Sequence, residues 1–336
     1  MSSRRRNSTA KRSLTVTTER WPIAGRFVLS RGAKTEAEIV LAEIVEGEFR
    51  GRGECVPYAR YGESTQSVAR AIEALAQPIA AGLSRSALQD ILPPGAARNA
   101  LDCALLDLEA KLSRRPAHAL LGLPAPKPVI TAFTLSLDTP AAMGEAAAAA
   151  KDRPLLKLKL GPDAALQAVR AVRAAAPQSR LIVDANEAWS LAALSALARP
   201  LQALGVCLIE QPLPAKNDAA LEGQSWAVPL CADESLHSRQ ELSAIARRYQ
   251  AVNIKLDKTG GLTEAVLLLN EAKSLGLTIM MGCMVATSLA MAPAALLATQ
   301  ADYVDLDGPL LLARDRDHGI RYTGSLMAPP EPVLWG

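Results

Sequence analysis

The sequence predicts an α/β protein in which a parallel β-barrel fills the later, larger part of the chain and a smaller α+β domain precedes it. From Pro128 onward, eight short apolar runs with strand character alternate with alanine- and leucine-rich helical segments. The runs recur roughly every 25 residues, which favours a barrel of βα units. The expected barrel strands span 129–135, 155–160, 181–186, 206–211, 230–234, 251–256, 278–283 and 302–307.

An open, doubly wound parallel sheet is the alternative to a barrel. Such sheets commonly carry a glycine-rich dinucleotide-binding turn after a strand, and Gly260-Gly261 is too short to be one. After the last expected strand the chain continues only as an irregular segment to Gly336, so the final helix of a complete barrel is doubtful.

The chain before the barrel has β-patterned runs first and helical runs afterwards, an order typical of an α+β domain. The strands resemble an antiparallel meander, and a loop is expected over 31–36. The β-patterned runs are 14–21, 26–30, 37–46 and 51–58, and the helical runs are 64–82, 86–91 and 96–111. We therefore divide the chain into a basic, disordered tail (1–12), an α+β domain (13–124), the barrel (125–314) and a C-terminal segment (315–336) that returns to the first domain.

Composition excludes several classes of function. A hydrophobic content of 49%, a charged content of 21% and a net charge of +3 are ordinary for a soluble globular protein. The basic tail is followed by no interleaved basic and aromatic surface, so nucleic acid is not an expected partner. It is also followed by no apolar core of a secretory signal, and no apolar run approaches the roughly 20 residues of a membrane span.

The cysteines and histidines do not form a recognisable site. The five cysteines are scattered and lack zinc-ligand spacing, so we expect buried free thiols in a reducing cytoplasm. The three histidines are far apart and stand near no nucleophile motif, so a hydrolase triad is weakly supported.

Charged residues stand at the ends of five consecutive expected barrel strands. Lys159, Asp184, Glu210, Asp233 and Lys255 are separated by 25, 26, 23 and 22 residues. Because the C-terminal ends of barrel strands converge on one mouth, these side chains are expected to line one cavity, where barrel active sites are built.

Asp184, Glu210 and Asp233 are the candidate metal ligands. Three carboxylates crowded in a pocket repel one another unless a cation neutralises them. An all-oxygen donor set favours a hard ion, either Mg²⁺ or Mn²⁺ as its substitute. The alternative, three separate helix N-caps, suits Asp184 but suits Glu210 poorly.

The lysines are candidate bases. Residues 155–161 alternate apolar and charged side chains, so Lys157 and Lys159 share one face of a strand. On an edge strand that face is simply solvated, and a lysine near carboxylates also acts as their counter-ion. Near a divalent ion, however, a lysine holds its proton less tightly, and a lowered pKa suits a general base such as Lys159 or Lys255.

The last expected strand carries Asp305 and Asp307 on one face, and this pair suits a bound ammonium group. A structural turn ahead of Gly308-Pro309 is the alternative interpretation.

Together these residues resemble the enolase superfamily, in the subgroup with the catalytic pattern of muconate-lactonising enzyme, and within it the dipeptide epimerases. Lys157-x-Lys159, Asp184, Glu210, Asp233 and Lys255 match the subgroup in identity, order and spacing, and Asp305-x-Asp307 matches the pair that marks dipeptide epimerases. Stretches resembling the L-Ala-D/L-Glu epimerases lie at 53–64, 97–102, 253–261 and 282–284.

The resemblance implies a (β/α)₇β modified TIM barrel under an N-terminal α+β capping domain. It implies one Mg²⁺ held by Asp184, Glu210 and Asp233, an enediolate stabilised by Lys157, and proton transfer by Lys159 and Lys255 on opposite faces of the α-carbon, a pattern known for enolase-type sites. Asp305 and Asp307 are then expected to hold the substrate ammonium group. Further substrate contacts are expected from Thr134, from the backbone of Met284, and from Lys34.

Lys34 occupies a position where related epimerases carry an arginine that faces the substrate's glutamate side chain. This change keeps the charge but loses the bidentate geometry.

The implied function is Mg²⁺-dependent epimerisation of L-Ala-D/L-Glu dipeptides in murein peptide recycling, with a dipeptide as the partner and a homo-oligomer compatible with the sequence. The alternatives are a cycloisomerase, an o-succinylbenzoate synthase, an epimerase for other dipeptides, a metal-free Schiff-base aldolase and a non-catalytic binding protein. Neither the cycloisomerase nor the synthase needs an ammonium pocket at Asp305 and Asp307.

Overall fold

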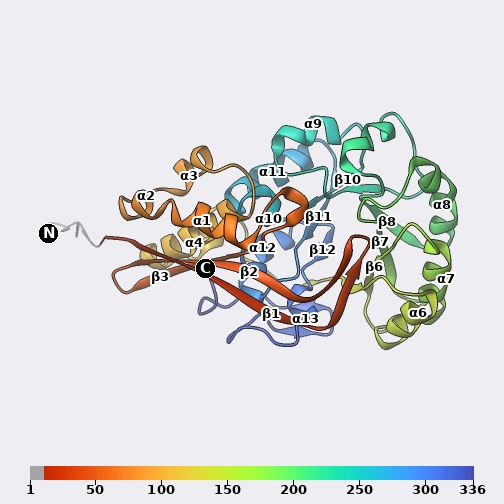
Figure 1. Ribbon diagram of the computed structural model, residues 1–336, viewed down its shortest axis with the longest axis horizontal. Helices are drawn as coiled ribbons and strands as arrows, with labels where there is room; N and C mark the ends of the chain where they lie inside the picture. Colours follow the sequence, from red (N-terminus) through yellow and green to blue (C-terminus); the bar gives the residue numbers. More distant parts are fainter. Residues whose placement is uncertain (1–10) are drawn as a thin grey trace.

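The computed structural model describes residues 11–336, and its larger part is a parallel barrel (Figure 1). Eight parallel strands follow one another in the order β12-β11-β10-β9-β8-β7-β6-β5, and the backbone N–H of Ala132, just before β5, donates to the carbonyl of Val304 in β12 at 2.8 Å. The predicted parallel barrel is therefore confirmed. The strands are β5 Phe133–Leu135, β6 Leu155–Lys159, β7 Arg180–Asp184, β8 Val206–Glu210, β9 Leu230–Ala232, β10 Ala251–Ile254, β11 Thr278–Gly282 and β12 Tyr303–Asp305.

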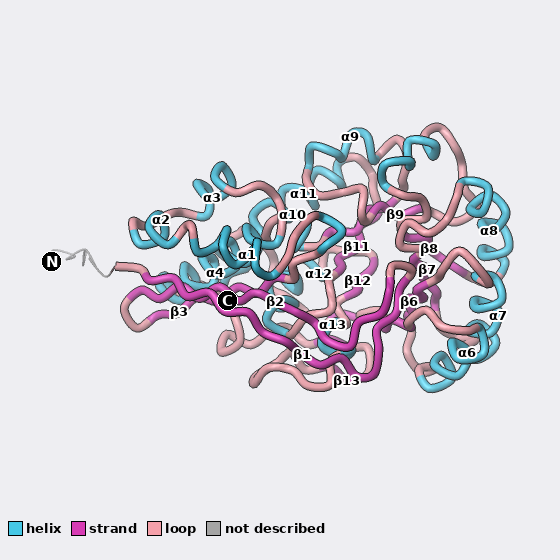
Figure 2. Tube along the Cα trace, viewed as in Figure 1, coloured by secondary structure: helices cyan, strands magenta, loops and turns pink. Residues whose placement is uncertain are grey.

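Helices cover the outside of the barrel and pack on its apolar outer face (Figure 2). After β8 and β9 the helices are short, and β12 is followed only by the four-residue α13. The absence of a full eighth helix after β12 agrees with the sequence expectation. The barrel helices are α6 Pro140–Ala149, α7 Ala165–Ala175, α8 Leu191–Ala203, η2 Ala215–Leu221, η3 Arg239–Glu241, α9 Leu242–Ile245, α10 Leu256–Thr259, α11 Leu262–Ser274, α12 Ser288–Ala298 and α13 Gly308–Leu311.

The N-terminal part is an antiparallel three-stranded sheet, order β1-β2-β3, packed against helices around its own apolar core. Its long β1–β2 hairpin extends beyond that core toward the barrel strands β6 and β7 (Figure 1). The hairpin can therefore place its turn over the barrel mouth. The elements are β1 Ser13–Leu29, β2 Gly32–Glu46, β3 Phe49–Cys55, η1 Ala59–Tyr61, α1 Thr65–Glu73, α2 Ala76–Ala80, α3 Arg85–Ile91, α4 Ala96–Ser113 and α5 Ala117–Leu120.

Several predicted element boundaries are wrong for local reasons. The runs 14–21 and 26–30 form one strand, β1, with a register shift between Pro22 and Phe27, and most of the predicted loop 31–36 belongs to β2. The predicted helix 64–82 is interrupted after Glu73, because Pro78 lacks an N–H and its ring clashes with the carbonyl four residues earlier. The run 129–135 divides into β4 Val129–Ile130 and β5.

The C-terminal segment first pairs with β4 and then reaches the capping domain. β13 Tyr322–Thr323 and β14 Leu326–Met327 form a small sheet with β4. The buried indole of Trp335 donates to the carbonyls of Arg52 and Cys103 at 3.0 and 3.2 Å. These contacts link the end of the described chain to β3 and α4, while the four domain boundaries proposed above stay predictions.

Two further expectations concern the N-terminal tail and membranes. Residues 1–10 of the predicted tail lie outside the described residues, and Arg12 pairs with Glu46 at 2.7 Å. Between residues 11 and 336, no helix is long and apolar enough to cross a membrane.

Candidate active site

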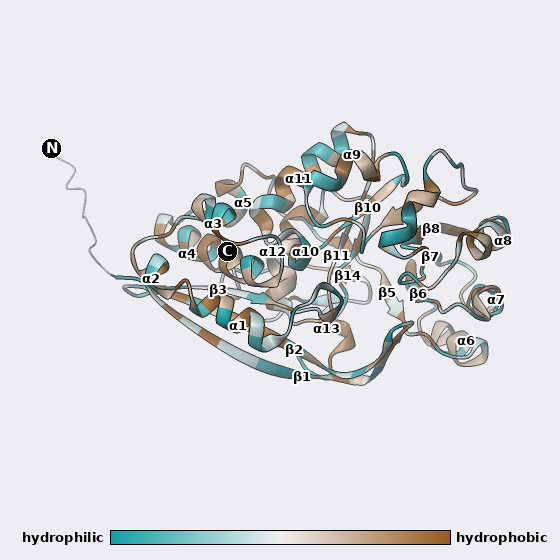
Figure 3. Ribbon diagram, turned by 45° about the horizontal axis from the view of Figure 1, so that its top comes forward, coloured by the Kyte–Doolittle hydropathy of each residue, from teal (hydrophilic) through white to brown (hydrophobic). Residues whose placement is uncertain are grey.

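The barrel interior changes from apolar to charged along strands β6 to β9. Seven buried side chains, one from each of seven strands or their leading residues, form an apolar layer: Ala132, Leu155, Ile182, Leu208, Cys231, Ala251 and Met280. Successive inward-facing residues of a strand are two apart, so the next inward positions are Lys157, Asp184, Glu210, Asp233 and Asn253. Because side chains two residues apart on a strand face the same way, the charged side chains lie together at one mouth, above the apolar layer. Figure 3 shows the hydrophobic character of the barrel strands.

Lys157 lies at the centre of the charged group. Its ammonium nitrogen is 2.7 Å from Glu210 Oε2, 2.8 Å from Asp305 Oδ2 and 3.3 Å from Asp184 Oδ2, and its side chain is 1% exposed. One buried cation thus holds carboxylates from three strands together.

Lys159 and Lys255 stand on opposite sides of the mouth. Lys159 Nζ lies 2.6 Å from Asp184 Oδ2, and Lys255 Nζ lies 2.8 Å from Asp233 Oδ2. Lys159 ends β6, and Lys255 directly follows β10. In the closed strand order, three strands separate β6 from β10 in either direction, so the two ammonium groups face each other across the barrel.

The pKa shifts follow from burial and from these pairs. Burial favours the neutral carboxyl of Asp184, but Lys159 and Lys157 outweigh it and lower the pKa to about 2. Burial and the neighbouring Asp184 raise the pKa of Glu210 to about 7. Burial would lower the pKa of Lys157 and of Lys255, yet the carboxylates around them raise both well above the usual lysine value. These rises come from the ion pairs with the carboxylates, and the lowered lysine pKa expected beside a divalent ion stays a prediction.

The chemistry of the carboxylates fits a hard divalent ion, although they are not arranged as a closed cage. Among residues 11–336, no three His, Cys, Asp or Glu side chains form a preorganised metal cluster, since ammonium groups stand between the carboxylates. The available donors are all oxygens, the type preferred by Mg²⁺. Glu210 Oε2 is buried without a hydrogen-bond partner, and its contact with Lys157 is an ion pair outside hydrogen-bond geometry. A buried, unsatisfied carboxylate oxygen of this kind is suited to a cation.

Neighbouring polar groups fix the carboxylates. Asn253 Nδ2 donates to Glu210 Oε1 at 2.8 Å, and Gln211 Oε1 accepts the backbone N–H of Asp233 at 2.9 Å. The fully buried Lys258 donates to Asp233 Oδ1 at 2.6 Å. The sequence analysis missed these three residues. For Asn253 a signal existed, because it stands two residues before Lys255 on the same inward face.

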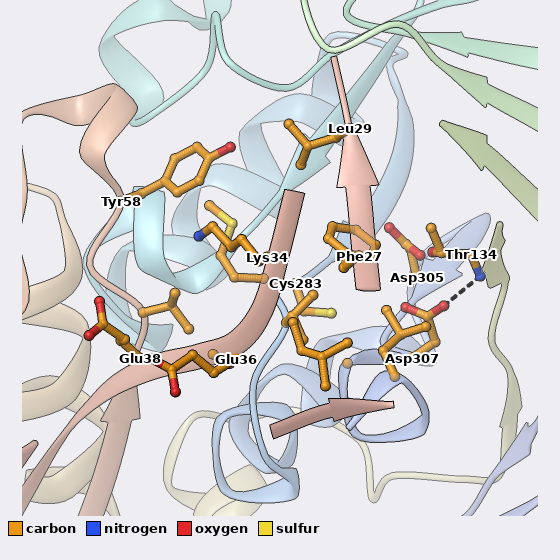
Figure 4. A pocket seen from close by; sticks show the side chains of 17 residues that line it. Phe27, Leu29, Lys34, Glu36, Glu38, Tyr58, Thr134, Cys283, Asp305 and Asp307 are labelled. Atoms are coloured by element: carbon orange, nitrogen blue, oxygen red, sulfur yellow. Dashed lines mark hydrogen bonds between the residues drawn. The ribbon is translucent and has the colours of Figure 1, made fainter. Parts of the chain in front are cut away.

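A cavity lies beside the charged group, between the β1–β2 hairpin and the barrel (Figure 4). Asp305 and Asp307 border it, and Asp307 Oδ2 accepts the backbone N–H of Thr134 at 2.6 Å. Burial and Asp305 raise the pKa of Asp307 to about 7. Of the six predicted substrate residues, Lys157 is not in the lining of this cavity, and the other five line it: Lys34, Thr134, Met284, Asp305 and Asp307.

The cavity wall also includes apolar and aromatic residues of the capping domain. Phe27, Leu29 and Tyr58 point into it, and the ring centroid of Phe27 is 5.9 Å from Lys159 Nζ. The ammonium of Lys34 lies 5.4 Å from the ring centroid of Tyr58. Burial lowers the pKa of Lys34, with a further lowering by Arg31 that Glu38 opposes.

Comparison with known proteins identifies similar chains across nearly the full length. Residues 11–122 match the mandelate racemase / muconate lactonizing enzyme N-terminal domain, and residues 142–331 match the enolase C-terminal domain-like family. The chain is 47% identical over 317 residues to the L-Ala-D/L-Glu epimerase of Escherichia coli K12, covering 93% of this chain and 98% of that protein. It is 49% identical over 303 residues to the N-acetyl-D-glutamate racemase of a Pseudoalteromonas species, covering 89% and 95%.

Solved structures show the same architecture. An enolase family member from Agrobacterium tumefaciens with homology to dipeptide epimerases, solved with sodium and L-Ala-L-Glu, superposes with a TM-score of 0.95 at 53% identity and covers 97% of this chain and 100% of that one. A dipeptide epimerase from Enterococcus faecalis with Mg and L-Leu-L-Tyr gives a TM-score of 0.87 at 27% identity, covering 96% and 98%. The chain therefore belongs to the mandelate racemase / muconate lactonizing enzyme family of the enolase superfamily.

Proposed function

We propose that this chain is a Mg²⁺-dependent isomerase that inverts the C-terminal residue of L-Ala-D/L-Glu dipeptides by 1,1-proton transfer at the α-carbon. The observation that carries the proposal is the placement of Lys159 and Lys255 on opposite sides of one charged mouth. Inversion of a carbon centre requires a proton to leave from one face and return to the other, and two facing amines can do both.

Asp184, Glu210 and Asp233 would hold the ion in this proposal. When bound there, Mg²⁺ supplies positive charge that stabilises the negative charge developing on the substrate carboxylate and competes with the lysines for these carboxylates. Mn²⁺ is a possible substitute. The E. faecalis relative solved with Mg supports the choice of ion.

This chain's own residues divide the remaining work. Lys157, held by three carboxylates, directs its ammonium at the substrate carboxylate and stabilises the enediolate. Lys159 and Lys255 remove and return the α-proton. Asp305 and Asp307 attract the ammonium group of the N-terminal residue, and Thr134 orients Asp307 through its backbone N–H. Lys34, on the opposite cavity wall, attracts the acidic side chain, and Met284 borders the same space.

The proposed role is recycling of murein peptides in the cytoplasm. Its support is the L-Ala-D/L-Glu epimerase name of the E. coli relative and the absence of disulfides among the five free cysteines of this chain.

The test is solvent-proton exchange. Purified protein with MgCl₂ in D₂O is incubated with L-Ala-L-Glu and, separately, with L-Ala-D-Glu, and NMR follows the α-proton of the glutamate. We expect deuterium at that carbon, formation of the other epimer and loss of both after EDTA treatment. Unchanged α-protons in the presence of Mg²⁺ contradict the proposal, and full activity in EDTA supports a metal-free mechanism instead.

N-acetylglutamate is a second candidate substrate, favoured by the surroundings of the aspartate pair. Asp305 Oδ2 already contacts Lys157 at 2.8 Å, and Asp307, with its pKa raised to about 7, already accepts the N–H of Thr134. One oxygen of each aspartate is thus engaged before any substrate binds, while Asp305 Oδ1 is buried without a hydrogen-bond partner. An acetyl group keeps the carbonyl and places a methyl where an alanyl group has its α-carbon, so it lacks the ammonium and the side-chain methyl, and the Pseudoalteromonas relative is an N-acetyl-D-glutamate racemase. The same exchange assay with both enantiomers of N-acetylglutamate tests this candidate.

A further inference from the structure

Arg31 stands at the tip of the β1–β2 hairpin and contacts the barrel mouth. Its Nη2 donates to Glu234 Oε1 at 2.8 Å, and its Nη1 donates to the carbonyl of Asn186 at 2.9 Å. The neighbouring Ser30 hydroxyl donates to the same carbonyl at 3.1 Å. One guanidinium therefore joins a turn of the capping domain to two separate barrel loops.

The two barrel loops are the ones that begin with proposed metal ligands. Glu234 directly follows Asp233, and its side chain is only 1% exposed. Asn186 is two residues after Asp184, and Asn186 Nδ2 donates to Glu234 Oε1 at 3.3 Å. Asn186 has a left-handed backbone conformation, with φ of 44°, which asparagine adopts more readily than most non-glycine residues.

Arg31 also connects to the cavity through Tyr58. Arg31 Nη2 donates to the hydroxyl of Tyr58 at 2.8 Å, and the ring of Tyr58 lies beside the ammonium of Lys34 (Figure 4). Lys34 is three residues after Arg31 and pairs in the hairpin with Phe27, which also lines the cavity. A fixed Arg31 therefore fixes the position of both cavity residues on the hairpin.

We propose that Arg31 is a positioning residue for substrate selection. Its hydrogen bonds to Glu234 and Asn186 hold the hairpin so that Lys34 faces the acidic side chain of the substrate. The inference rests on the proposed function, because Lys34 selects an acidic side chain only there. Arg31 does not touch the reacting atoms. Its planar fork bridges several acceptors at once, a geometry that a lysine does not reproduce.

Arg60 provides a matched comparison within the same interface. It joins the capping domain to the barrel by two hydrogen bonds to Glu187, at 2.7 and 2.8 Å. Its partner Glu187 also receives a weaker contact from Arg31 at 3.3 Å. Arg60 lies in η1, outside the β1–β2 hairpin, and its side chain bonds to Glu187, so it carries the same charge across the same interface without holding the hairpin that bears Lys34.

The experiment compares Arg31→Met, Lys34→Met, Arg60→Met and Glu234→Gln in the Mg²⁺-loaded enzyme. Two substrates of equal shape, L-Ala-L-Glu and L-Ala-L-Gln, give the preference for an acidic side chain as a ratio of kcat/KM. Hydrogen exchange of the backbone amides of residues 26–36 reports hairpin order without relying on catalysis. Arg31→Lys shows whether charge alone suffices.

We expect Arg31→Met to raise KM for L-Ala-L-Glu about tenfold with kcat nearly unchanged, the loss of roughly one charge-assisted hydrogen bond. Its preference for glutamate should fall as in Lys34→Met, but only Arg31→Met and Glu234→Gln should accelerate hydrogen exchange in the hairpin. Arg60→Met should keep both the preference and the hairpin protection. Arg31→Lys should recover less than half of the lost preference.

An Arg31→Met enzyme with wild-type preference and wild-type hairpin exchange overturns the proposal, as does an equal effect of Arg60→Met. If Arg31→Met does not fold, Glu234→Gln decides by the same two measurements. A wild-type protein that exchanges no α-proton of L-Ala-L-Glu removes the proposed function and with it the selective role of Arg31. If Arg31→Met turns over the dipeptide but hydrogen exchange of its hairpin amides is unchanged, only the positioning role of Arg31 is overturned.

Discussion

Replacing Lys157 by methionine tests whether the buried ammonium holds the mouth together. Methionine is nearly as long but uncharged, so the change leaves Glu210, Asp305 and Asp184 without the cation that now lies 2.7, 2.8 and 3.3 Å from them. Removing one partner of a buried ion pair costs about 3–5 kcal/mol, because an uncompensated buried charge remains. Three acceptors share this cation and Asp184 keeps Lys159, so we expect a loss of unfolding free energy within that range.

The loss should depend on pH in a defined direction. Without Lys157, which lowers the pKa of Glu210, that pKa rises further in the folded state, so the folded state binds more protons than the unfolded state above the ordinary carboxyl pKa. Stability of the variant should therefore fall as the pH rises, and the difference from wild type should be largest at alkaline pH. Because Glu210 already has a pKa raised to about 7 in the wild type, the gap should narrow below neutrality.

The assay is urea unfolding of both proteins, each at pH 5.5 and 8, with and without MgCl₂. We expect Mg²⁺ to stabilise Lys157→Met more than the wild type, because a divalent ion can supply the missing positive charge. Lys216→Met is the matched control, since it removes the same charge from a lysine outside this ion-pair cluster. Equal stability of Lys157→Met and wild type at pH 8 without Mg²⁺ would refute the reasoning.

Three further predictions follow from single contacts. Burial raises the pKa of Asp257 to about 7, so the folded protein binds an extra proton between about pH 4 and 7 and loses stability as the pH rises through that window. In urea unfolding, Asp257→Asn should therefore gain stability relative to wild type from pH 5 to 8. A parallel pH dependence of the two proteins contradicts this. A Cβ at Gly282 would clash with Asn253 Oδ1, so Gly282→Ala should displace the amide that orients Glu210. We expect weaker Mg²⁺ binding in calorimetry, and an unchanged Mg²⁺ affinity would contradict this. Asp307→Asn should lower kcat/KM for L-Ala-L-Glu roughly tenfold by weakening the ammonium contact while sparing N-acetylglutamate, and equal losses for both substrates would oppose that role.

The alternation of residues made much of the mouth predictable. Lys157, Asp184, Glu210 and Asp233 each follow an apolar inward residue by two positions, so their convergence needed only the strand period and barrel closure. The same rule reaches Asn253, which was overlooked because an asparagine in an apolar strand attracts less notice than a charge.

Contacts that depend on the relative placement of distant segments were not predictable. Arg31 meets Glu234 across 203 residues of chain, and no local pattern relates a hairpin turn to the residue after β9. The pKa of Lys255 depends likewise on the placement of Asp233, whose charge opposes the lowering by burial. Local rules did explain the interruption before Pro78, although the helical periodicity of the region outweighed it in the prediction.

Isotope exchange in the two lysine variants tests the central claim most directly. Lys159→Met and Lys255→Met, each loaded with MgCl₂ in D₂O, are incubated with L-Ala-L-Glu and L-Ala-D-Glu, and mass spectrometry follows deuterium at the glutamate α-carbon together with the ratio of epimers. The two-base account predicts that neither variant converts one epimer into the other and that neither exchanges both epimers at the wild-type rate. Deuterium entry at the wild-type rate from both epimers in both variants would contradict it.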